Sequence, residues 1–435
     1  MIPRVNVKLW GRTIGAAAPN PNSPGFFAFE FDPNYLGSHA NPAPLTMPDL
    51  TPYTFRDLPE ATFHGLPGML ADSLPDRYGN ALIDAWLAQQ GRTPASFNAL
   101  ERLCYLGTRG MGALEFEPAL ETGANMLTAD RVDVDRMVEL ASAILARHAN
   151  AQVTLPIPDK DDAAMRQILS IGSSPGGARA KALISWNPAT NEILSGHVQA
   201  PDGFEAWIIK FDGIAENRDH DLADPLGYSL IEYAYYLMAV ESGIETSECR
   251  LLTHNGLHHF MTRRFDRRGD GTKLLMQSLG ALRHFDFNDG NAPHGYEQAM
   301  ETCFLLGLGQ DAVEQQFRRM VFNVMSRNQD DHVKNISFLM SESGEWRLSP
   351  AYDVTFSFNP DGWTQSHQMR VAGKRSEITR DDLLAAGSTG NIKPARCEAI
   401  IDATSATIAR WPEFAATAGV SDERAVAIGN LHEPI

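Results

Sequence analysis

Apolar and polar residues alternate along several short segments near the N-terminus, the pattern of half-buried β-strands. Val5, Val7 and Leu9 alternate with polar positions, and the run FFAFEF at 26–31 predicts a second strand. The segment LPDRYGNALIDAWLAQQ at 74–90 predicts a turn followed by an amphipathic helix. Together these elements predict a loop-rich α/β module over residues 4–117.

Helical periodicity appears in the middle and at the end of the chain. In the segment 133–148, Met137, Leu140, Ala141 and Ile144 fall on one helix face. The same criterion predicts helices at 226–242, 316–325 and 394–409. From residue 277 onward helices dominate, so that a strand-rich part precedes a helix-rich part. This order is typical of an α+β fold.

Strands and a hairpin are predicted between these helices. The segment AWIIKF at 206–211 predicts a buried strand that ends on Lys210. A lysine there either pairs with a charged partner or extends into water, and the strand alone leaves both open. Strands at 249–253 and 257–265 flank Asn255–Gly256, a strong signal for a type I′ hairpin.

Composition and charge narrow the class of protein. The chain has 435 residues, 43% hydrophobic and 21% charged, as expected for two or three soluble domains. No apolar run suits a membrane span or a signal peptide, so a cytoplasmic location is expected. The net charge of −17 argues against strong stand-alone nucleic-acid binding. A local arginine cluster at 263–268 is explained equally well as a basic patch or as a solvated strand end.

The stretch 325–356, MSRNQDDHVKNISFLMSESGEWRLSPAYDVTF, carries the clearest chemical pattern. Asp330, Asn335 and Asp353 follow in the order of the catalytic base and the two magnesium ligands of a protein kinase. Alternating residues around Ser343–Gly344 predict a hairpin between Asn335 and Asp353. Any one of the three is more simply an ordinary loop residue. Their order, with a hairpin between them, favours the catalytic interpretation.

Two glycine-rich segments are candidates for contact with phosphate. They are GTRGMG at 107–112 and SIGSSPGGARAK at 170–181. Backbone N–H groups in such turns can approach phosphate oxygens closely. Neither segment has the GxGxxG spacing of common protein kinases, so each alone is more simply a turn.

These motifs together resemble the HipA-like serine/threonine kinases, toxins of bacterial type II toxin–antitoxin systems. SSPGGARAKALI resembles the family's serine-bearing glycine loop, WIIKF its lysine strand, RRFDR its hinge, and NQDDHVKN and SPAYDV its catalytic and metal loops. LPDRYGN and GTRGMGALEF resemble its N-terminal subdomain. The resemblance implies a two-lobed, protein-kinase-like α+β fold. An N-terminal subdomain is expected at 1–120, a β-rich small lobe at 121–270 and a helical large lobe at 271–435.

The resemblance also implies a role for each motif. Asp330 would be the catalytic base, Lys210 braced by Glu232 would hold the phosphates of ATP, and Asn335 and Asp353 would bind Mg²⁺. Residues expected at the nucleotide are Gly176, Gly177, Ala178, Arg179, Ala180, Lys181, Lys210, Arg263, Arg264, Phe265, His332, Val333, Lys334, Asn335, Tyr352 and Asp353. Ser174, or Ser173 beside it, would be autophosphorylated, which in the family ejects the glycine loop and turns the kinase off.

Two positions depart from the family pattern. Ala180 stands where proline is common, and Asp331 follows the expected base where a small residue is frequent. The two adjacent carboxylates of Asp330 and Asp331 either raise a pKa or point apart, and the sequence leaves both open.

The resemblance implies partners as well as chemistry. The expected substrate is a protein with a Ser or Thr acceptor, such as an aminoacyl-tRNA synthetase or another translation component. The expected partner is a small helix-turn-helix antitoxin (HipB-like), and DNA would be reached only through it. No membrane partner is expected. The alternatives are a kinase-like phosphotransferase for small molecules and a non-catalytic co-repressor partner of a DNA-binding antitoxin.

Overall fold

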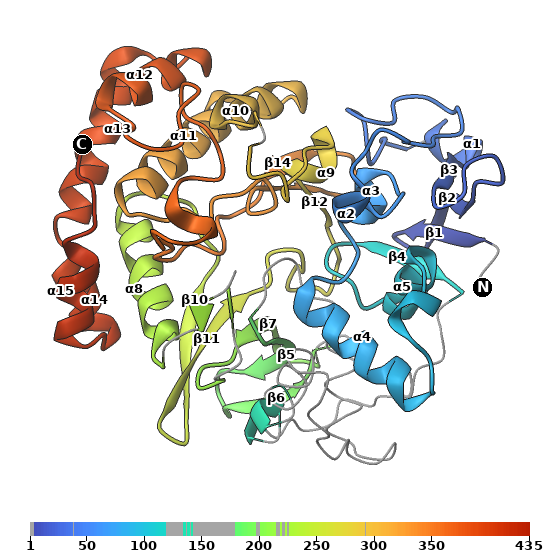
Figure 1. Cartoon of the computed structure of the whole chain (residues 1–435), viewed down its shortest axis with the longest axis horizontal. Coiled ribbons are helices and arrows are strands. Elements are labelled where there is room, and N and C mark those ends of the chain that lie inside the picture. Colours follow the sequence, from blue (N-terminus) through green and yellow to red (C-terminus); the bar gives the residue numbers. More distant parts are fainter. Residues whose placement is uncertain are drawn as a thin grey trace. The chain divides into compact units, whose positions relative to one another are not determined.

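A computed structural model describes residues 4–37, 39–118, 134–135, 137–139, 141, 179–196, 201–214, 218–219, 222–223, 226–291 and 293–435. The chain divides into two compact units, drawn in Figure 1. Unit 1 comprises Met1–Leu226, Leu252–Gln277 and Met340–Glu345. Unit 2 comprises Gly227–Leu251, Ser278–Leu339 and Trp346–Ile435.

The N-terminal module of unit 1 contains a four-stranded antiparallel sheet. Its strands β1 (Val5–Leu9), β2 (Arg12–Pro19), β3 (Phe27–Phe31) and β4 (Leu114–Glu117) follow the order β3-β2-β1-β4. The predicted alternation in β1 is confirmed, because Val5, Val7 and Leu9 are all buried. Val7 pairs with Phe116 of β4, so the first and last strands of this module are neighbours.

Short helices fill the connection between β3 and β4. They are α1 (Pro33–Leu36), α2 (Glu60–Phe63), α3 (Gly68–Ala71), α4 (Arg77–Gln89), the 3₁₀ turn η1 (Pro94–Ser96) and α5 (Ala99–Leu106). The predicted helix within 74–90 is α4, and its N-cap is Asp76, whose side chain accepts from Gly79 N–H at 2.7 Å. The capping box of Asn98 and Glu101 fixes the start of α5.

A five-stranded sheet follows, in the order β10-β11-β7-β5-β6. Its strands are β5 (Lys181–Asn187), β6 (Glu192–Ser195), β7 (Glu205–Lys210), β10 (Cys249–His254) and β11 (Leu257–Arg263); β8 (Arg218–Asp219) and β9 (Leu222–Ala223) pair separately. In the turn between β10 and β11, Asn255 has φ +47° and Gly256 has φ +78°. Positive φ at both central positions is the signature of the type I′ turn, so the predicted hairpin is confirmed.

One hydrophobic core joins the N-terminal module to the five-stranded sheet. Tyr78 and Leu82 of α4 lie in the same buried cluster as Trp207 of β7. Trp207 also meets Trp186 of β5 edge to face, with ring centroids 5.5 Å apart. The helical residues described within 133–148 add Val134, Met137 and Ala141 to this core. Segments on both sides of the expected boundary at residue 120 therefore share one core within unit 1.

Unit 2 is mainly helical. Its helices are α8 (Tyr228–Glu241), α9 (Leu279–Arg283), α10 (Tyr296–Leu305), α11 (Gln310–Met325), α12 (Arg380–Thr389), α13 (Pro394–Ile408), α14 (Trp411–Ala418) and α15 (Asp422–Gly429), with a 3₁₀ turn η3 at Trp363–Gln365. Helix α11 packs against α10 and α13, and α14 packs against α8 and α15 (Figure 1).

The remaining short strands are β12 (Leu275–Ser278), β13 (Ser337–Met340) and β14 (Trp346–Leu348). Strands β13 and β14 are neighbours, and Gly344 in the turn between them has φ +85°. The hairpin predicted between Asn335 and Asp353 is therefore confirmed. It places Asn335 just before β13 and Asp353 shortly after β14.

Candidate active site

The catalytic stretch begins at the end of α11, and its backbone is held there by hydrogen bonds. The N–H of Asn328 donates to the carbonyl of Asn323 at 3.0 Å, and the N–H of Gln329 donates to that of Ser357 at 3.1 Å. The predicted apolar face of α11 is buried: Phe317, Met320, Val321 and Val324. A firmly packed helix end therefore supports the loop that follows it.

Asn335 is held in this loop by two hydrogen bonds. Its backbone N–H donates to the carbonyl of His332 at 2.8 Å, and its side-chain Nδ2 donates to the carbonyl of Asp330 at 2.8 Å. Because the nitrogen end of the amide donates to Asp330, the side-chain oxygen is the end that can accept. A cation ligand needs this orientation of the amide.

Tyr352 and Asp353 lie just after β14. The Tyr352 hydroxyl donates to the carbonyl of Lys334 at 2.6 Å and lies 2.5 Å from the hydroxyl of Ser337, which ties the metal loop to the catalytic loop. Asp353 has φ +52°, a left-handed conformation that aspartate adopts more readily than most residues. Asn335 and Asp353 line the same small cavity.

This cavity suits a small, hard cation. Its volume of about 30 Å³ is sufficient for a water molecule or an ion. Asn335 and Asp353 offer a carboxamide and a carboxylate oxygen, and Mg²⁺ is usually held by few protein oxygens together with water and phosphate. Within the described ranges, no group of three or more His, Cys, Asp or Glu residues could hold a metal. The pair of oxygen donors is thus the candidate metal site.

The neighbouring carboxylates of Asp330 and Asp331 meet different partners. One oxygen of Asp330 accepts from the indole N–H of Trp363 at 3.1 Å. Asp331 is only 3% exposed and accepts from the hydroxyl of Tyr296 and from the backbone N–H of Gln368, both at 2.7 Å. The two carboxylates thus bind different groups, and the pKa of Asp331 is lowered and not raised.

Burial and hydrogen bonding act in opposite directions on Asp331. Burial alone raises the pKa of its carboxyl. The charge of His367 and the hydrogen bonds from His367, Tyr296 and Gln368 outweigh burial, so the pKa of Asp331 is below its usual value. The Nδ1 atom of His367 lies 2.8 Å from Asp331 Oδ2. Asp331 is therefore an ionised structural anchor at neutral pH.

Residues 332–334 of the catalytic loop face different surroundings. Val333 is 2% exposed, so its side chain belongs to the core of unit 2, and its expected place beside the nucleotide stays a prediction. His332 and Lys334 both contact Phe287: the two ring centroids are 5.6 Å apart, and the Lys334 ammonium lies 4.8 Å from the phenyl centroid. Phe287 thus supports the exposed side of the loop.

Lys210 ends strand β7 in unit 1, as predicted. Its Nζ lies 5.7 Å from the ring centroid of Phe260, the residue opposite it on β11. Glu232 lies on α8 of unit 2 and is 1% exposed. The expected pairing of Lys210 with Glu232 stays a prediction.

Much of the glycine loop falls outside the described residues. This holds for Ser173, Ser174, Gly176, Gly177 and Ala178, so their expected contacts with nucleotide and their modification stay predictions. Arg179 and Ala180 are described, and both are buried.

Lys181 makes a contact other than the one the family resemblance implies. Its ammonium lies 3.0 Å from the carboxylate of Asp76, and both side chains are at most 5% exposed. Asp76 also caps α4 through Gly79. The ion pair therefore joins α4 to the start of β5. The ammonium is therefore engaged in a buried contact, and the expected position of Lys181 over the nucleotide stays a prediction.

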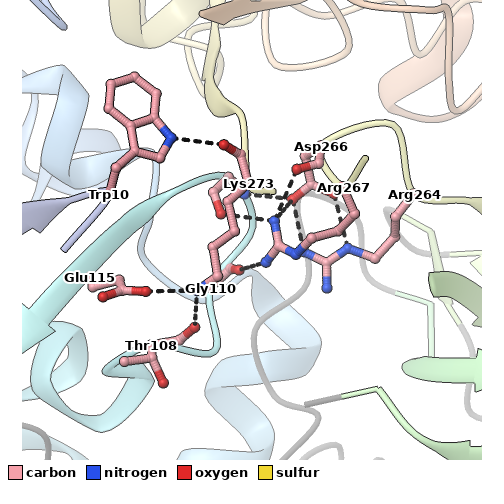
Figure 2. A network of polar contacts seen from close by, with 9 residues as sticks. Trp10, Thr108, Gly110, Glu115, Arg264, Asp266, Arg267 and Lys273 are labelled. Carbon is pink, nitrogen blue, oxygen red and sulfur yellow. Dashed lines mark hydrogen bonds and ion pairs between the residues drawn. The ribbon is translucent and has the colours of Figure 1, made fainter. Parts of the chain in front are cut away.

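Arg264, within the predicted hinge at 263–265, belongs to a buried ion network shown in Figure 2. Its guanidinium donates to both oxygens of Asp266, at 2.9 and 2.8 Å, and Arg267 donates to the same carboxylate at 2.7 Å. Burial raises the pKa of Asp266, but the two guanidinium groups lower it well below its usual value. Arg263 pairs with Glu205 at 3.0 Å. The arginine cluster is thus largely engaged in intramolecular pairs.

The loop GTRGMG braces this network from the N-terminal module. The N–H of Gly112 donates to Asp266 at 2.7 Å, while Arg267 donates to the carbonyls of Gly110 and Gly112 at 3.2 and 2.9 Å. Gly112 has φ +73°, and a Cβ there would lie 3.0 Å from the backbone nitrogen of Met276. Gly112 therefore allows close backbone contact, which agrees with a turn more than with a phosphate cradle.

Lys273 anchors the segment after the hinge to the same module (Figure 2). The indole of Trp10 donates to its carbonyl at 2.7 Å. Its ammonium lies 2.7 Å from the carboxylate of Glu115 and 3.1 Å from the carbonyl of Thr108. The N-terminal module therefore binds the segment that follows the predicted hinge in the sequence.

Four residues at the site escaped the sequence analysis: Tyr296, Trp363, His367 and Gln368. The segment around Trp363, NPDGWTQSHQM, has the composition of a polar loop. Its spacing from the catalytic stretch gives no sign of contact with Asp330 or Asp331. Across the parts of the chain that the structure describes, no helix combines the length and apolar character needed to cross a membrane.

A strand-rich unit, a helical unit and the loops around β13 and β14 that carry Asn335 and Asp353 define a protein-kinase-like fold with an added N-terminal module. The family model of the HipA-like C-terminal domain matches residues 173–411, and that of the HipA N-terminal domain matches residues 5–117. The chain therefore belongs to the HipA family, and the resemblance inferred from its motifs is confirmed.

One solved structure agrees on the fold. HipA of Shewanella oneidensis MR-1, from a toxin–antitoxin complex with HipB and operator DNA, is 17% identical to this chain, with a TM-score of 0.62. The match covers 98% of this chain and 94% of that one. The Helicobacter pylori proinflammatory kinase CtkA matches 52% of this chain and 92% of its own at 13% identity, with a TM-score of 0.30 that is too low to support an argument.

Proposed function

We propose that this protein is an ATP- and Mg²⁺-dependent kinase that phosphorylates a Ser or Thr hydroxyl of a protein. One observation carries the proposal: Asn335 and Asp353 line one cavity, and the Asn335 amide is bonded to the backbone of Asp330. A base and two oxygen ligands for a cation on adjoining loops are the parts that phosphoryl transfer requires. Membership of the HipA family supports the same reaction class.

In this proposal Asp330 takes the proton of the acceptor hydroxyl. The acceptor oxygen forms a bond to the γ-phosphorus of ATP, the bond from that phosphorus to the bridging oxygen breaks, and ADP leaves. Asn335 and Asp353 would hold Mg²⁺, whose charge offsets that of the phosphates. Lys210, braced by Glu232, would hold the phosphates.

The proposed protein substrate is a component of translation, such as an aminoacyl-tRNA synthetase, and the proposed partner is a small helix-turn-helix antitoxin. The second rests on one observation: the related Shewanella structure contains HipA together with HipB and operator DNA. Autophosphorylation of Ser174 or Ser173 is the proposed off-switch.

Mass spectrometry of the purified protein after incubation with ATP and Mg²⁺ tests the proposal. We expect phosphate on Ser174 or Ser173, and a rate at least about 100-fold lower in Asp330→Asn, because a general base contributes that much or more. Asp361→Asn, an exposed aspartate in a neighbouring loop, is the matched control and should behave as wild type.

Two further arms identify the acceptor. Transfer to proteins of a heat-treated bacterial extract, and none to a panel of small hydroxylated compounds, would support a protein kinase over a small-molecule phosphotransferase. A wild-type protein that neither binds ATP nor transfers phosphate to itself, to the extract or to the panel would overturn the catalytic proposal.

A further inference from the structure

Residues 363–368 of unit 2 contact three consecutive residues of the catalytic loop. The side-chain Nε2 of Gln368 donates to the carbonyl of Gln329 at 3.3 Å, and the indole of Trp363 donates to Asp330 Oδ1 at 3.1 Å. The next residue, Asp331, is bound by the backbone N–H of Gln368 at 2.7 Å and lies 2.8 Å from His367. We name residues 363–368 the clamp segment.

We infer that Trp363 is a positioning residue for Asp330, and that the clamp segment holds Trp363 in place by gripping Asp331. This inference rests on the proposed kinase function, because it assigns the indole a role in orienting the base of that reaction.

The chemistry of the indole suits this task. Its N–H can only donate, so it can bind the carboxylate and cannot compete with Asp330 for the substrate proton. The contact also fixes the rotation of the carboxylate about its Cβ–Cγ bond, so that the same oxygen faces the acceptor hydroxyl in each turnover.

Hydrogen bonds within the clamp segment, and from Arg375, fix the position of Trp363. Besides Gln329, the amide of Gln368 donates to the carbonyls of Trp363 and Ser366, both at 2.9 Å. Arg375 donates to the side-chain oxygen of Gln368 at 3.0 Å, and the N–H of His367 donates to the carbonyl of Arg375 at 3.0 Å. Both Gln368 and His367 are buried.

Asp331 is the point at which the clamp segment grips the loop. It is buried, and its two carboxylate oxygens accept from groups in the clamp segment and from Tyr296 of α10. Asp331 neighbours Asp330 in sequence, so a shift of the clamp segment moves the backbone of the base. A small residue at position 331 could not accept these hydrogen bonds. This gives a physical reason for an aspartate at a position where the family often has a small residue.

Trp363→Phe is the direct test, because it keeps an aromatic ring and removes the donor. We expect kcat to fall about tenfold, a part of the hundredfold or more that a base contributes, while KM for ATP stays unchanged. With kcat normalised to the folded fraction of each variant, a purely structural role would leave kcat unchanged.

Matched variants separate this effect from general damage. Trp346→Phe, at a half-buried tryptophan of β14, should leave kcat and KM unchanged. Trp363→His supplies an N–H donor again and should recover part of the rate. If Trp363→Phe fails to fold, Gln368→Leu provides the second measurement, since it removes the bonds to Gln329 and Trp363 and should also lower kcat at constant KM.

The outcomes distinguish two failures. Wild-type transfer with an unchanged kcat in folded Trp363→Phe would overturn the positioning role and leave the kinase proposal standing. A wild-type protein without phosphoryl transfer would overturn both.

Discussion

Asp331 and His367 are 3% and 2% exposed, and their facing atoms lie 2.8 Å apart. Removing such a pair from water costs free energy, which is offset only where the remaining donors and acceptors are satisfied. Tyr296 and Gln368 supply those bonds, so Asp331 is held by three groups from two segments of unit 2. A carboxylate beside the proposed base therefore stabilises the loop and takes no part in proton transfer.

Replacing Asp331 by Asn should destabilise the protein by about 3 kcal/mol at pH 7, because one partner of a buried pair is lost. The folded state lowers the pKa of Asp331, so its contribution is present above the unfolded value of about 4 and is lost as pH falls through the lower folded value. The difference between variant and wild type should thus shrink as pH falls below about 4.

Urea unfolding followed by tryptophan fluorescence at several pH values measures this difference. The exposed Asp361→Asn variant controls for the loss of a surface charge. Equal stability of Asp331→Asn and wild type at pH 7 would show that the anchor is dispensable.

At the scale of secondary-structure elements, the ion pair of Lys181 with Asp76 joins the first strand of the five-stranded sheet to helix α4. Both side chains are nearly inaccessible to water, and Asp76 also accepts from the N-terminal turn of α4. The same helix packs Tyr78 and Leu82 into the core beneath the sheet. The N-terminal module is thus attached to the sheet by a charged contact and an apolar one.

Lys181→Met should therefore lower the unfolding free energy by about 3–5 kcal/mol, because it leaves the carboxylate of Asp76 buried without its cation. ATP affinity of the folded variant should stay within about twofold of wild type, whereas Lys210→Met should lose most of it. Thermal unfolding and isothermal titration with ATP measure the two effects. The double variant with Asp76→Asn should regain part of the stability. Normal stability together with lost ATP binding in Lys181→Met would instead support a nucleotide-binding role for Lys181.

Local elements could be predicted from the sequence because their causes are local. Asn255–Gly256 specifies the turn of the β10–β11 hairpin, and the apolar period of α11 specifies its buried face. The contacts of Lys181 with Asp76 and of Trp363 with Asp330 join residues far apart in sequence. No periodicity or spacing encodes such pairs. The order of Asp330, Asn335 and Asp353 could be recognised in the sequence for a different reason, because phosphoryl transfer requires those residue types.

At the scale of the whole molecule, the chain carries a net charge of −17, and its densest arginine cluster is engaged internally. Arg264 and Arg267 both donate to Asp266, and Arg267 also donates to the carbonyls of Gly110 and Gly112. The guanidinium N–H groups of Arg264 and Arg267 are engaged in these bonds, so fewer donors remain for phosphates. In a complex with the proposed antitoxin, contact with DNA should therefore come chiefly from the antitoxin.

We therefore expect the purified chain alone to bind duplex DNA with a Kd no tighter than about 10⁻⁵ M at 150 mM salt, within the range of non-specific binding. Fluorescence anisotropy with a labelled duplex of about 20 base pairs measures it. Few phosphate contacts predict a shallow dependence on salt, and Arg268→Glu at an exposed position should weaken binding only slightly. Submicromolar binding with a steep salt dependence would instead reveal a basic surface that the intramolecular pairs of Arg264 and Arg267 leave available.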